Sequence, residues 1–200
     1  STPLYSSAAS DVYKRQALRM RRKGIQVFII APLKGHEFYR AARNVGGEFI
    51  QISPASKNCI NIMEIRKVDN SVNELLDGPT LDASALAGKI QRLHIFFSLL
   101  IPDMSHEEKQ LLDEALIKTY ALKGITHKNE SLTDPQHPEQ YKKMPILEDV
   151  YNVLLESEDT KRLAHILNRL VHGSAFSFNQ QTNVDLTNKY TVLDLSLIHI

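Results

Sequence analysis

The feature that most constrains the fold is an alternation of apolar runs with a turn and a helical pattern near the start of the chain. The apolar run at residues 25–30 (Ile-Gln-Val-Phe-Ile-Ile) is rich in β-branched side chains, which favour a buried strand. The predicted elements, in order, are a strand at 25–30, a turn at 31–35, a helix at 36–44 closed by Gly46 and Gly47, and a strand at 48–52. This order is the elementary α/β unit, in which a right-handed crossover joins two strands.

Beyond residue 80 the apolar spacing becomes helical. Pro102, the capping box that begins at Ser105, and the glycines at 124 and 173 mark helix ends. The predicted elements are helices at 81–101, 105–123, 146–156 and 160–172, a surface loop at 126–145, and short strands at 183–186 and 190–194. The expected fold class is therefore α/β, with the α/β part at 17–80, a mostly α-helical insertion at 81–173 and a return to core strands at 174–194.

The two ends of the chain can be encoded by the two strands of one DNA sequence. Residues 11–16 (Asp-Val-Tyr-Lys-Arg-Gln) fit GATGTGTATAAGAGACAG, and residues 195–200 (Leu-Ser-Leu-Ile-His-Ile) fit its reverse complement. Protein folding does not select such an inverted repeat, which resembles the transposon end used to prepare metagenomic and genomic sequencing libraries. We therefore expect residues 1–16 and 195–200 to be adapter-derived and non-native, and residues 17–194 to be an internal fragment of a longer protein.

Charge and cysteine content exclude several classes of protein. The chain has 24 Lys and Arg against 23 Asp and Glu, and the terminal segments contain Lys14, Arg15 and Asp11, so residues 17–194 are electrically balanced. Such a balance gives no electrostatic indication of nucleic-acid binding. Cys59 is the single cysteine, which excludes an internal disulfide and a cysteine-based zinc site. A lone thiol in a turn-rich segment is more often a small packing residue than a nucleophile.

Sequence motifs for phosphate binding and hydrolysis are absent. Neither Gly-x-x-x-x-Gly-Lys-Ser/Thr nor Gly-x-Gly-x-x-Gly nor Gly-x-Ser-x-Gly occurs. Gly88 and Lys89 lie inside a helical pattern, which is no place for a phosphate loop. No metal ligands are predicted, because histidines such as His165 and His172 lack a closely spaced partner ligand.

The turn after the first predicted strand is the most suggestive position for a ligand, since open α/β sheets bind ligands at the carboxyl ends of their strands. Lys34 and Gly35 are weak candidates for contacting a phosphate, and Glu37 is a weak candidate catalytic residue that would orient water or a cation. The competing interpretation is that Lys34 is solvated and Glu37 complements the helix dipole. The sequence by itself favours this second interpretation.

Three segments resemble the conjugation and type IV secretion traffic ATPases (the VirB/TraE/TraC type, in the HerA–FtsK group of P-loop NTPases). They are Val-Phe-Ile-Ile-Ala-Pro-Leu-Lys-Gly-His-Glu-Phe at 27–38, Gly-Gly-Glu-Phe-Ile-Gln-Ile-Ser-Pro at 46–54 and Ile-Asn-Ile-Met-Glu-Ile at 60–65. The family pattern is a strand ending in Asp-Pro-x-x-Glu-Tyr, then Gly-Gly, Ile-Ser-Pro and Ile-Asn-Pro. Here Ala31 replaces the Asp and Ile62 replaces the Pro of Ile-Asn-Pro, while Glu37 is retained.

The resemblance implies a fragment of a P-loop NTPase-type sheet. The parent would be an ATPase that uses ATP and Mg²⁺ to power conjugative DNA transfer or type IV secretion. It would form a homo-hexamer at the inner, cytoplasmic face of a bacterial membrane and bind membrane-embedded channel proteins; direct DNA contact is left open. The family's phosphate loop and metal-supporting carboxylates would lie before residue 25 and after Asp194, so we expect this chain alone to be inactive.

Two alternatives stay open at this level. The helical half could be a protein-interaction module of a non-catalytic transfer-apparatus protein. A DNA-pumping relative from the same group of NTPases would share the quoted motifs and differ downstream.

Overall fold

The computed structural model describes residues 4–32, 35–53, 56–66, 84–173 and 176–195, with side chains from residue 11 onward except that of Phe176. The chain divides into two compact units. Unit 1 comprises residues 1–59 and 183–200, and unit 2 comprises residues 60–182. The chain therefore passes between the units twice, after Cys59 and before Asn183.

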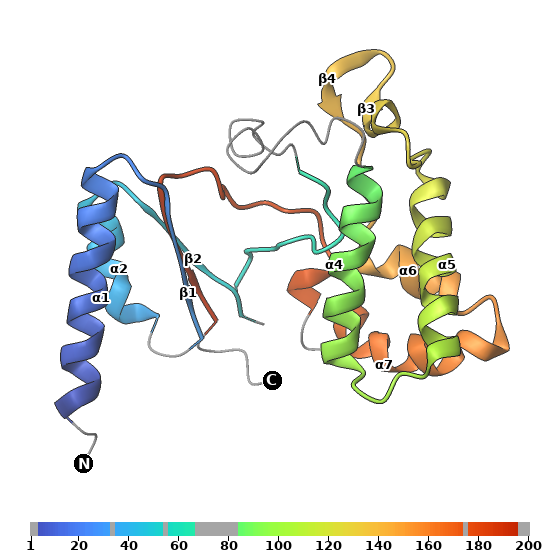
Figure 1. Cartoon of the computed structure of the whole chain (residues 1–200), viewed down its shortest axis with the longest axis horizontal. Helices are drawn as coiled ribbons and strands as arrows, with labels where there is room; N and C mark the ends of the chain where they lie inside the picture. The colour runs from blue at the N-terminus through green and yellow to red at the C-terminus, as the bar shows by residue number, and fades with distance from the viewer. Residues whose placement is uncertain (1–3, 33–34, 54–55, 67–83, 174–175, 196–200) are drawn as a thin grey trace. The chain divides into compact units, whose positions relative to one another are not determined.

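Unit 1 is built on a three-stranded parallel sheet (Figure 1). Its elements are α1 (Leu4–Arg22), β1 (Val27–Ala31), α2 (His36–Asn44), β2 (Glu48–Gln51) and β5 (Tyr190–Asp194). β5 lies between β1 and β2 and pairs with both in parallel, so the last described strand is the centre of the sheet. The predicted strand–turn–helix–strand order and the α/β fold class are confirmed.

One face of this sheet carries the small core of unit 1. Val27, Tyr190 and Val192 are buried there against Ala17 of α1 and Ala42 of α2. The alternation along β1 places Phe28 and Ile30 on the opposite face, where they are 46% and 61% exposed. The sheet is therefore covered by helices on one face, whereas parallel sheets usually have both faces covered.

Gly46 ends α2 as the sequence indicates. It has a φ of +66° just beyond the last helical turn, a conformation that glycine adopts without steric cost. The amide of Gly47 then donates to the Ala42 carbonyl at 2.8 Å, and the chain turns directly into β2.

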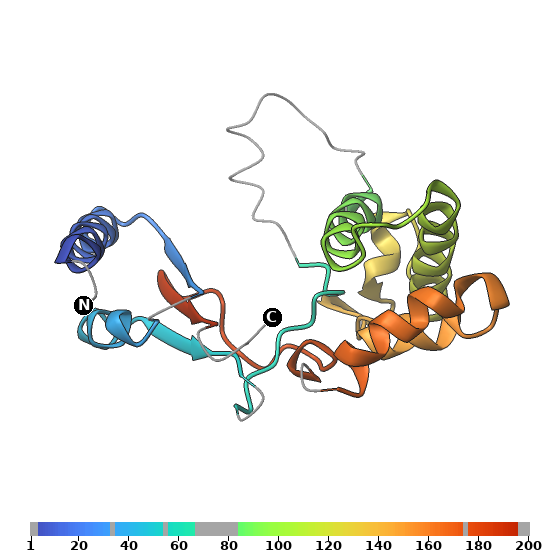
Figure 2. The same ribbon diagram turned by 90° about the horizontal axis from the view of Figure 1, so that it is seen from below.

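Unit 2 is a helical bundle with a small hairpin. Its principal elements are α4 (Ala85–Leu100), α5 (His106–Leu122), β3 (Thr133–Asp134), β4 (His137–Tyr141), α6 (Leu147–Leu154) and α7 (Lys161–Val171). Short 3-10 turns occur at Asn129–Leu132, Glu158–Thr160 and Phe176–Phe178. α4 lies alongside α5, and α6 alongside α7 (Figures 1 and 2).

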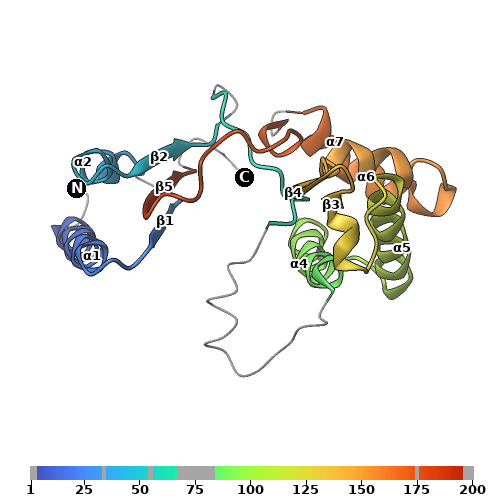
Figure 3. The ribbon, with the colours of Figure 1, turned by 90° about the horizontal axis from the view of Figure 1, so that it is seen from above.

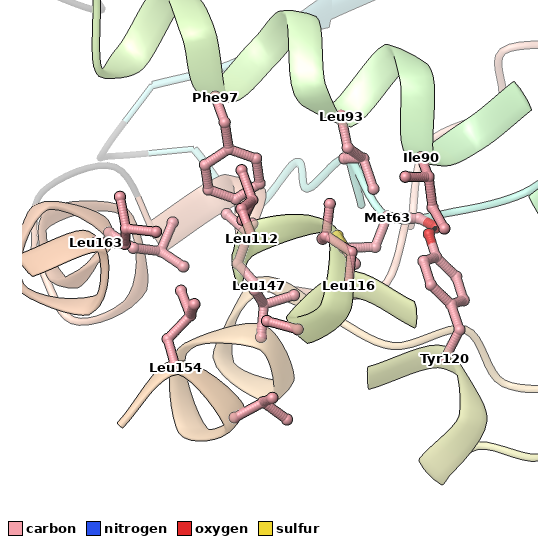
Figure 4. Close-up of a cluster of buried hydrophobic side chains, with 14 of the residues drawn as sticks. Met63, Ile90, Leu93, Phe97, Leu112, Leu116, Tyr120, Leu147, Leu154 and Leu163 are labelled. Atoms are coloured by element: carbon pink, nitrogen blue, oxygen red, sulfur yellow. Dashed lines mark hydrogen bonds between the residues drawn. The ribbon is translucent and has the colours of Figure 1, made fainter. Parts of the chain in front are cut away.

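The four helices of unit 2 share one apolar core (Figure 4). Phe97, Leu112, Leu147 and Leu163 are all at most 1% exposed, one from each helix. Tyr120 is also buried, and its hydroxyl donates to the Met63 carbonyl at 2.5 Å, which anchors the segment before α4 to α5 (Figure 4). The apolar stripes predicted from the sequence are the surfaces that meet in this core.

Asn61 fixes the entry of the chain into unit 2. Its buried side chain donates to the Pro145 carbonyl at 2.9 Å and accepts from the Met63 amide at 2.9 Å. Its own amide donates to Thr182 Oγ1 at 3.0 Å, so the first and last segments of the unit are joined here. Buried polar groups satisfied in this way specify one arrangement of a core.

Two local predictions were wrong. The predicted loop at 126–145 contains the antiparallel β3–β4 hairpin (Figure 3), because extended residues on either side of a short turn can satisfy each other's backbone groups. Residues 183–186 form no strand. Asp185 instead accepts from the Thr187 amide at 2.8 Å and its hydroxyl at 2.6 Å, a local turn that competes with sheet pairing.

The predicted limits of the segments stay predictions. The boundaries at 80/81 and 173/174 adjoin residues 67–83 and 174–175, which lie outside the described residues. α1 runs across residues 16 and 17 without interruption, so no structural break marks the predicted adapter junction. No described helix combines the length and apolar character needed to cross a membrane.

Candidate functional site at the carboxyl edge of the sheet

The carboxyl ends of the three parallel strands of unit 1 form one edge. Asp194 ends the central strand, with Ala31 as its register partner in β1 and Gln51 as its partner in β2. Asp194 and Ala31 are each only 3% exposed. This edge is where open parallel sheets place ligands, so a buried carboxylate at its centre is the strongest candidate feature of the unit.

Gly35 lies directly against this carboxylate. A Cβ built on Gly35 would stand 2.1 Å from Asp194 Oδ1 and 2.3 Å from its Cγ. Gly35 is buried, has a φ of −54° and precedes the first residue of α2. Glycine is therefore required here for its lack of a side chain, since the backbone conformation is open to any residue.

Glu37 lies in the first turn of α2, where a negative charge complements the helix dipole. Its Oε2 is 3.4 Å from Lys14 Nζ, with side chains 28% and 22% exposed. Lys14 also lies 3.4 Å from Asp11 and 5.7 Å from the centre of the Phe38 ring. One partner of Glu37, Lys14, thus comes from the segment that the sequence predicts to be adapter-derived.

The three weak candidates have different outcomes. The structure brings Gly35 to the sheet edge and places Glu37 in the first turn of the following helix. Lys34 lies outside the described residues. Their roles in phosphate binding or catalysis stay predictions.

Asp194 was visible in the sequence only as a single carboxylate after an apolar run. Asp194 is buried at the centre of the sheet edge because β1 and β2 lie on either side of it. Its register partners in these strands are more than 140 positions away in the chain. The sequence signal that could have identified Asp194 is a carboxylate at the end of a strand, after four residues suited to the centre of a sheet.

The described residues do not supply a complete site for Mg²⁺ or for a nucleotide. Among them there is no group of three or more His, Cys, Asp or Glu side chains placed to hold a metal ion. The edge offers one buried carboxylate and the glycine beside it, whereas Mg²⁺–phosphate sites also need a backbone cradle and a cation. No catalytic step is therefore assigned to these residues.

A surface pocket of about 510 Å³ lies elsewhere in unit 1, between α1 and α2. Its lining residues are Leu18, Arg21, Arg22, Ala41, Asn44 and Val45. Ala41 and Asn44 lie in the C-terminal half of α2, and Val45 follows the helix, so the pocket is at the end remote from Gly35. We give more weight to the sheet edge, because a buried carboxylate is a more specific feature than an open hollow between two helices.

Cys59 and the two spaced histidines show no catalytic arrangement. Cys59 is buried, and burial raises the pKa of its thiol, which opposes formation of a nucleophilic thiolate. His172 is bonded to Asn168 at 2.8 Å and packs edge-on against Tyr151. His165 is exposed on α7.

Comparison with known proteins gives one informative result. No family model matches the chain, and no curated protein matches it in sequence. Among solved structures, VirB4 of Thermoanaerobacter pseudethanolicus matches with a TM-score of 0.74 and 26% identity over 95% of this chain. The chain has the fold of a VirB4-type traffic ATPase. The resemblance inferred from the sequence is thereby confirmed for the fold, over both units.

The chain spans 66% of the matched VirB4 chain. About a third of that structure therefore has no counterpart here, which agrees with the predicted fragment of a larger ATPase. The lack of a phosphate-loop motif in the 200 residues is compatible with this coverage.

Proposed function

We propose that the chain is part of an ATPase that powers conjugative DNA transfer or type IV secretion. The observation that carries this proposal is the match to VirB4 over 95% of the chain, including the parallel sheet and the helical unit. The sheet edge formed by Ala31, Asp194 and Gly35 is consistent with it, because P-loop NTPases bind nucleotide at this edge of a parallel sheet.

The parent protein would bind ATP and Mg²⁺ and act as a homo-hexamer. It would lie at the inner face of a bacterial membrane and contact the embedded channel proteins of the secretion apparatus. In this proposal the phosphate loop and the Mg²⁺-holding residues come from the third of the fold that has no counterpart here. Asp194 and Gly35 would shape the edge beside them.

The chain by itself should neither hydrolyse ATP nor bind it tightly, because the main groups for phosphoryl transfer are missing from its sequence. Steady phosphate release from the purified chain, abolished by EDTA, would contradict this. The parent is tested by extending the genomic sequence upstream. A Gly-x-x-x-x-Gly-Lys-Ser/Thr segment within a few tens of residues before residue 25 supports the ATPase, and an intact reading frame without it opposes the proposal.

Residues 1–16 and 195–200 remain our proposed adapter-derived segments. The natural gene should then encode different residues before residue 17 and after residue 194, and the extended genomic sequence would show this. Independent reads of the natural gene that encode residues 11–16 directly before residue 17 would overturn this. If the proposal holds, the contact between Lys14 and Glu37 is foreign to the natural protein.

A second candidate function is a protein-interaction module in unit 2. The observation in its favour is on α4, where Ile95 and Leu99 are 63% and 78% exposed one helical turn apart. Apolar side chains so exposed are common singly and less common in pairs on one helix face. Upstream sequence without a phosphate loop would favour this module over the ATPase.

A further inference from the structure

The pocket between α1 and α2 in unit 1 has a lining that is half apolar and half polar. The two helices lie side by side there (Figures 1 and 3), and the pocket has a volume of about 510 Å³. Its apolar lining residues are Leu18, Ala41 and Val45, and its polar ones are Arg21, Arg22 and Asn44. A pocket of this size, with apolar walls and a few polar groups, is typical of sites for small organic ligands.

Arg21 has a buried donor that no group of the protein uses. Its Nε atom is buried without a hydrogen-bond partner, and among the described residues only one other side-chain atom, Tyr190 Oη, shares this state. The side chain as a whole is partly exposed and lines the pocket. A buried guanidinium N–H without a partner is unfavourable, so an acceptor that reaches it from the pocket would be stabilising.

The backbone at the end of α1 does not supply this acceptor. The Met20 carbonyl accepts from the Ile25 amide at 3.1 Å. The Arg21 carbonyl accepts from the Gly24 amide at 3.0 Å. Arg21 and Arg22 complement the negative end of the helix dipole, a role that needs no ligand. The pocket lining nevertheless holds two guanidinium groups and no carboxylate, so it has positive charge that a ligand can balance.

We propose that this pocket binds a small organic anion in which a carboxylate or phosphate group is joined to an apolar part. The Nε–H and one Nη–H of a guanidinium lie along one edge, and they pair with two oxygens of such a group. Because Arg21 is only partly buried, rotation about its terminal torsions can turn this edge toward the pocket. Arg22 adds a second positive charge, and the apolar part of the ligand packs on the apolar lining.

The pocket is independent of the other features proposed for this chain. Its lining residues all come from residues 18–45, so none of them belongs to the segments predicted to be adapter-derived. The pocket is also remote from Gly35, so an anion bound there does not lie at the carboxyl edge of the sheet. Its test therefore measures ligand binding and does not depend on ATP hydrolysis.

The test titrates sodium hexanoate or hexyl phosphate into the complete 200-residue chain at constant ionic strength and follows the arginine Nε–H signals by NMR spectroscopy. We expect a saturable shift of the Arg21 signal, which is identified by its absence from the spectrum of Arg21→Gln. The relative affinities of the two probes show which anionic group is preferred. Hexan-1-ol lacks the charge and acetate lacks the alkyl chain, so each should bind at least about tenfold more weakly than hexanoate. No saturable shift with either anionic probe, or equal affinity for hexan-1-ol or acetate, would overturn the proposal.

Three variants separate the pocket from a general attraction to positive charge, with the Val45 backbone amide signal as the reporter in each. Arg21→Gln should weaken binding of the preferred anionic probe about tenfold. Ala41→Leu fills the pocket without changing the charge and should weaken it as much. The matched control Arg19→Gln removes an exposed charge of the same helix outside the lining and should keep the original affinity. Equal weakening by Arg19→Gln and Arg21→Gln, or unchanged binding in Ala41→Leu, would overturn the proposal.

Discussion

Gly35 and Asp194 are packed so closely that a single added carbon on Gly35 would stand 2.1 Å from the Asp194 carboxylate oxygen. The two residues are 159 positions apart in the sequence; Gly35 immediately precedes α2, and Asp194 ends the central strand. Their contact places the turn after β1 over the carboxyl edge of the sheet. The shape of this edge therefore depends on a glycine that no backbone angle requires.

Gly35→Ala should destabilise unit 1 by about 1–3 kcal/mol, because the new methyl group overlaps a buried carboxylate that has little room to move. The free energy of unfolding in urea measures this. Gly88→Ala is the matched control, since its methyl group meets nothing within 4 Å and should stabilise α4 by about 0.5–1 kcal/mol. The cost of Gly35→Ala should shrink in an Asp194→Gly background. A cost that is unchanged there would show that the contact is not its cause.

Asn61→Ala should destabilise unit 2 by about 2–4 kcal/mol. It removes two side-chain hydrogen bonds and leaves the Met63 amide and the Pro145 carbonyl without these partners in a buried place. Asn152→Ala, at an exposed position of α6, serves as the control and should change stability by less than about 0.5 kcal/mol. Equal effects of the two substitutions would contradict an anchoring role for Asn61.

Tyr120→Phe should cost about 1–2 kcal/mol at neutral pH, because the Met63 carbonyl loses its buried donor while the ring volume is kept. Tyr151→Phe, at a partly buried position of α6, is the matched control with a small expected effect. Chemical unfolding measures the loss of stability in the two variants. A larger loss for Tyr120→Phe supports the hydrogen bond, and equal losses would show that the Tyr-to-Phe change itself is poorly tolerated.

The buried hydroxyl of Tyr120 should also make the stability of the fold dependent on pH. Burial raises the pKa of Tyr120 above its ordinary value of 10.0, so the native state holds the proton more tightly than the unfolded state. Stability from this source is complete below pH 10.0 and is lost as the pH rises further, by up to about 1.4 kcal/mol per pH unit. Tyr120→Phe should lack this loss. Parallel alkaline unfolding curves for the two proteins would refute the assignment.

Glu108→Gln should weaken the start of α5 by less than about 1 kcal/mol, as befits a partly exposed group. The Ser105 amide, followed by Arg162, holds the pKa of Glu108 below its ordinary value of 4.5. The stabilisation is therefore present above pH 4.5 and is lost as the pH falls through the native pKa. The difference between the variant and the natural residue, measured by thermal unfolding, should vanish in acid. A difference that persists there would point to packing rather than charge.

Local patterns were sufficient for most of the elements. β-Branched residues in 25–30 and 48–52, the capping box at Ser105 and the glycine at 46 specify strands, a helix start and a helix end through interactions within a few residues. The apolar stripes of α4 to α7 likewise identified the surfaces that became buried. The hairpin β3–β4 and the turn at Asp185 were missed because polar side chains in such segments have several ways to satisfy the backbone.

By itself, the sequence determined the strands and helices, the lack of a phosphate-loop motif, the balanced charge and the resemblance to traffic ATPases. Only the tertiary structure decided that β5 lies between β1 and β2, that Asp194 faces Gly35 beside Ala31, and that the Asn61 side chain links the Met63 amide to the Pro145 carbonyl. The physical reason is distance along the chain. Hydrogen bonds and apolar spacing within an element are written in neighbouring residues, whereas burial of a charge depends on which remote segments the fold brings against it.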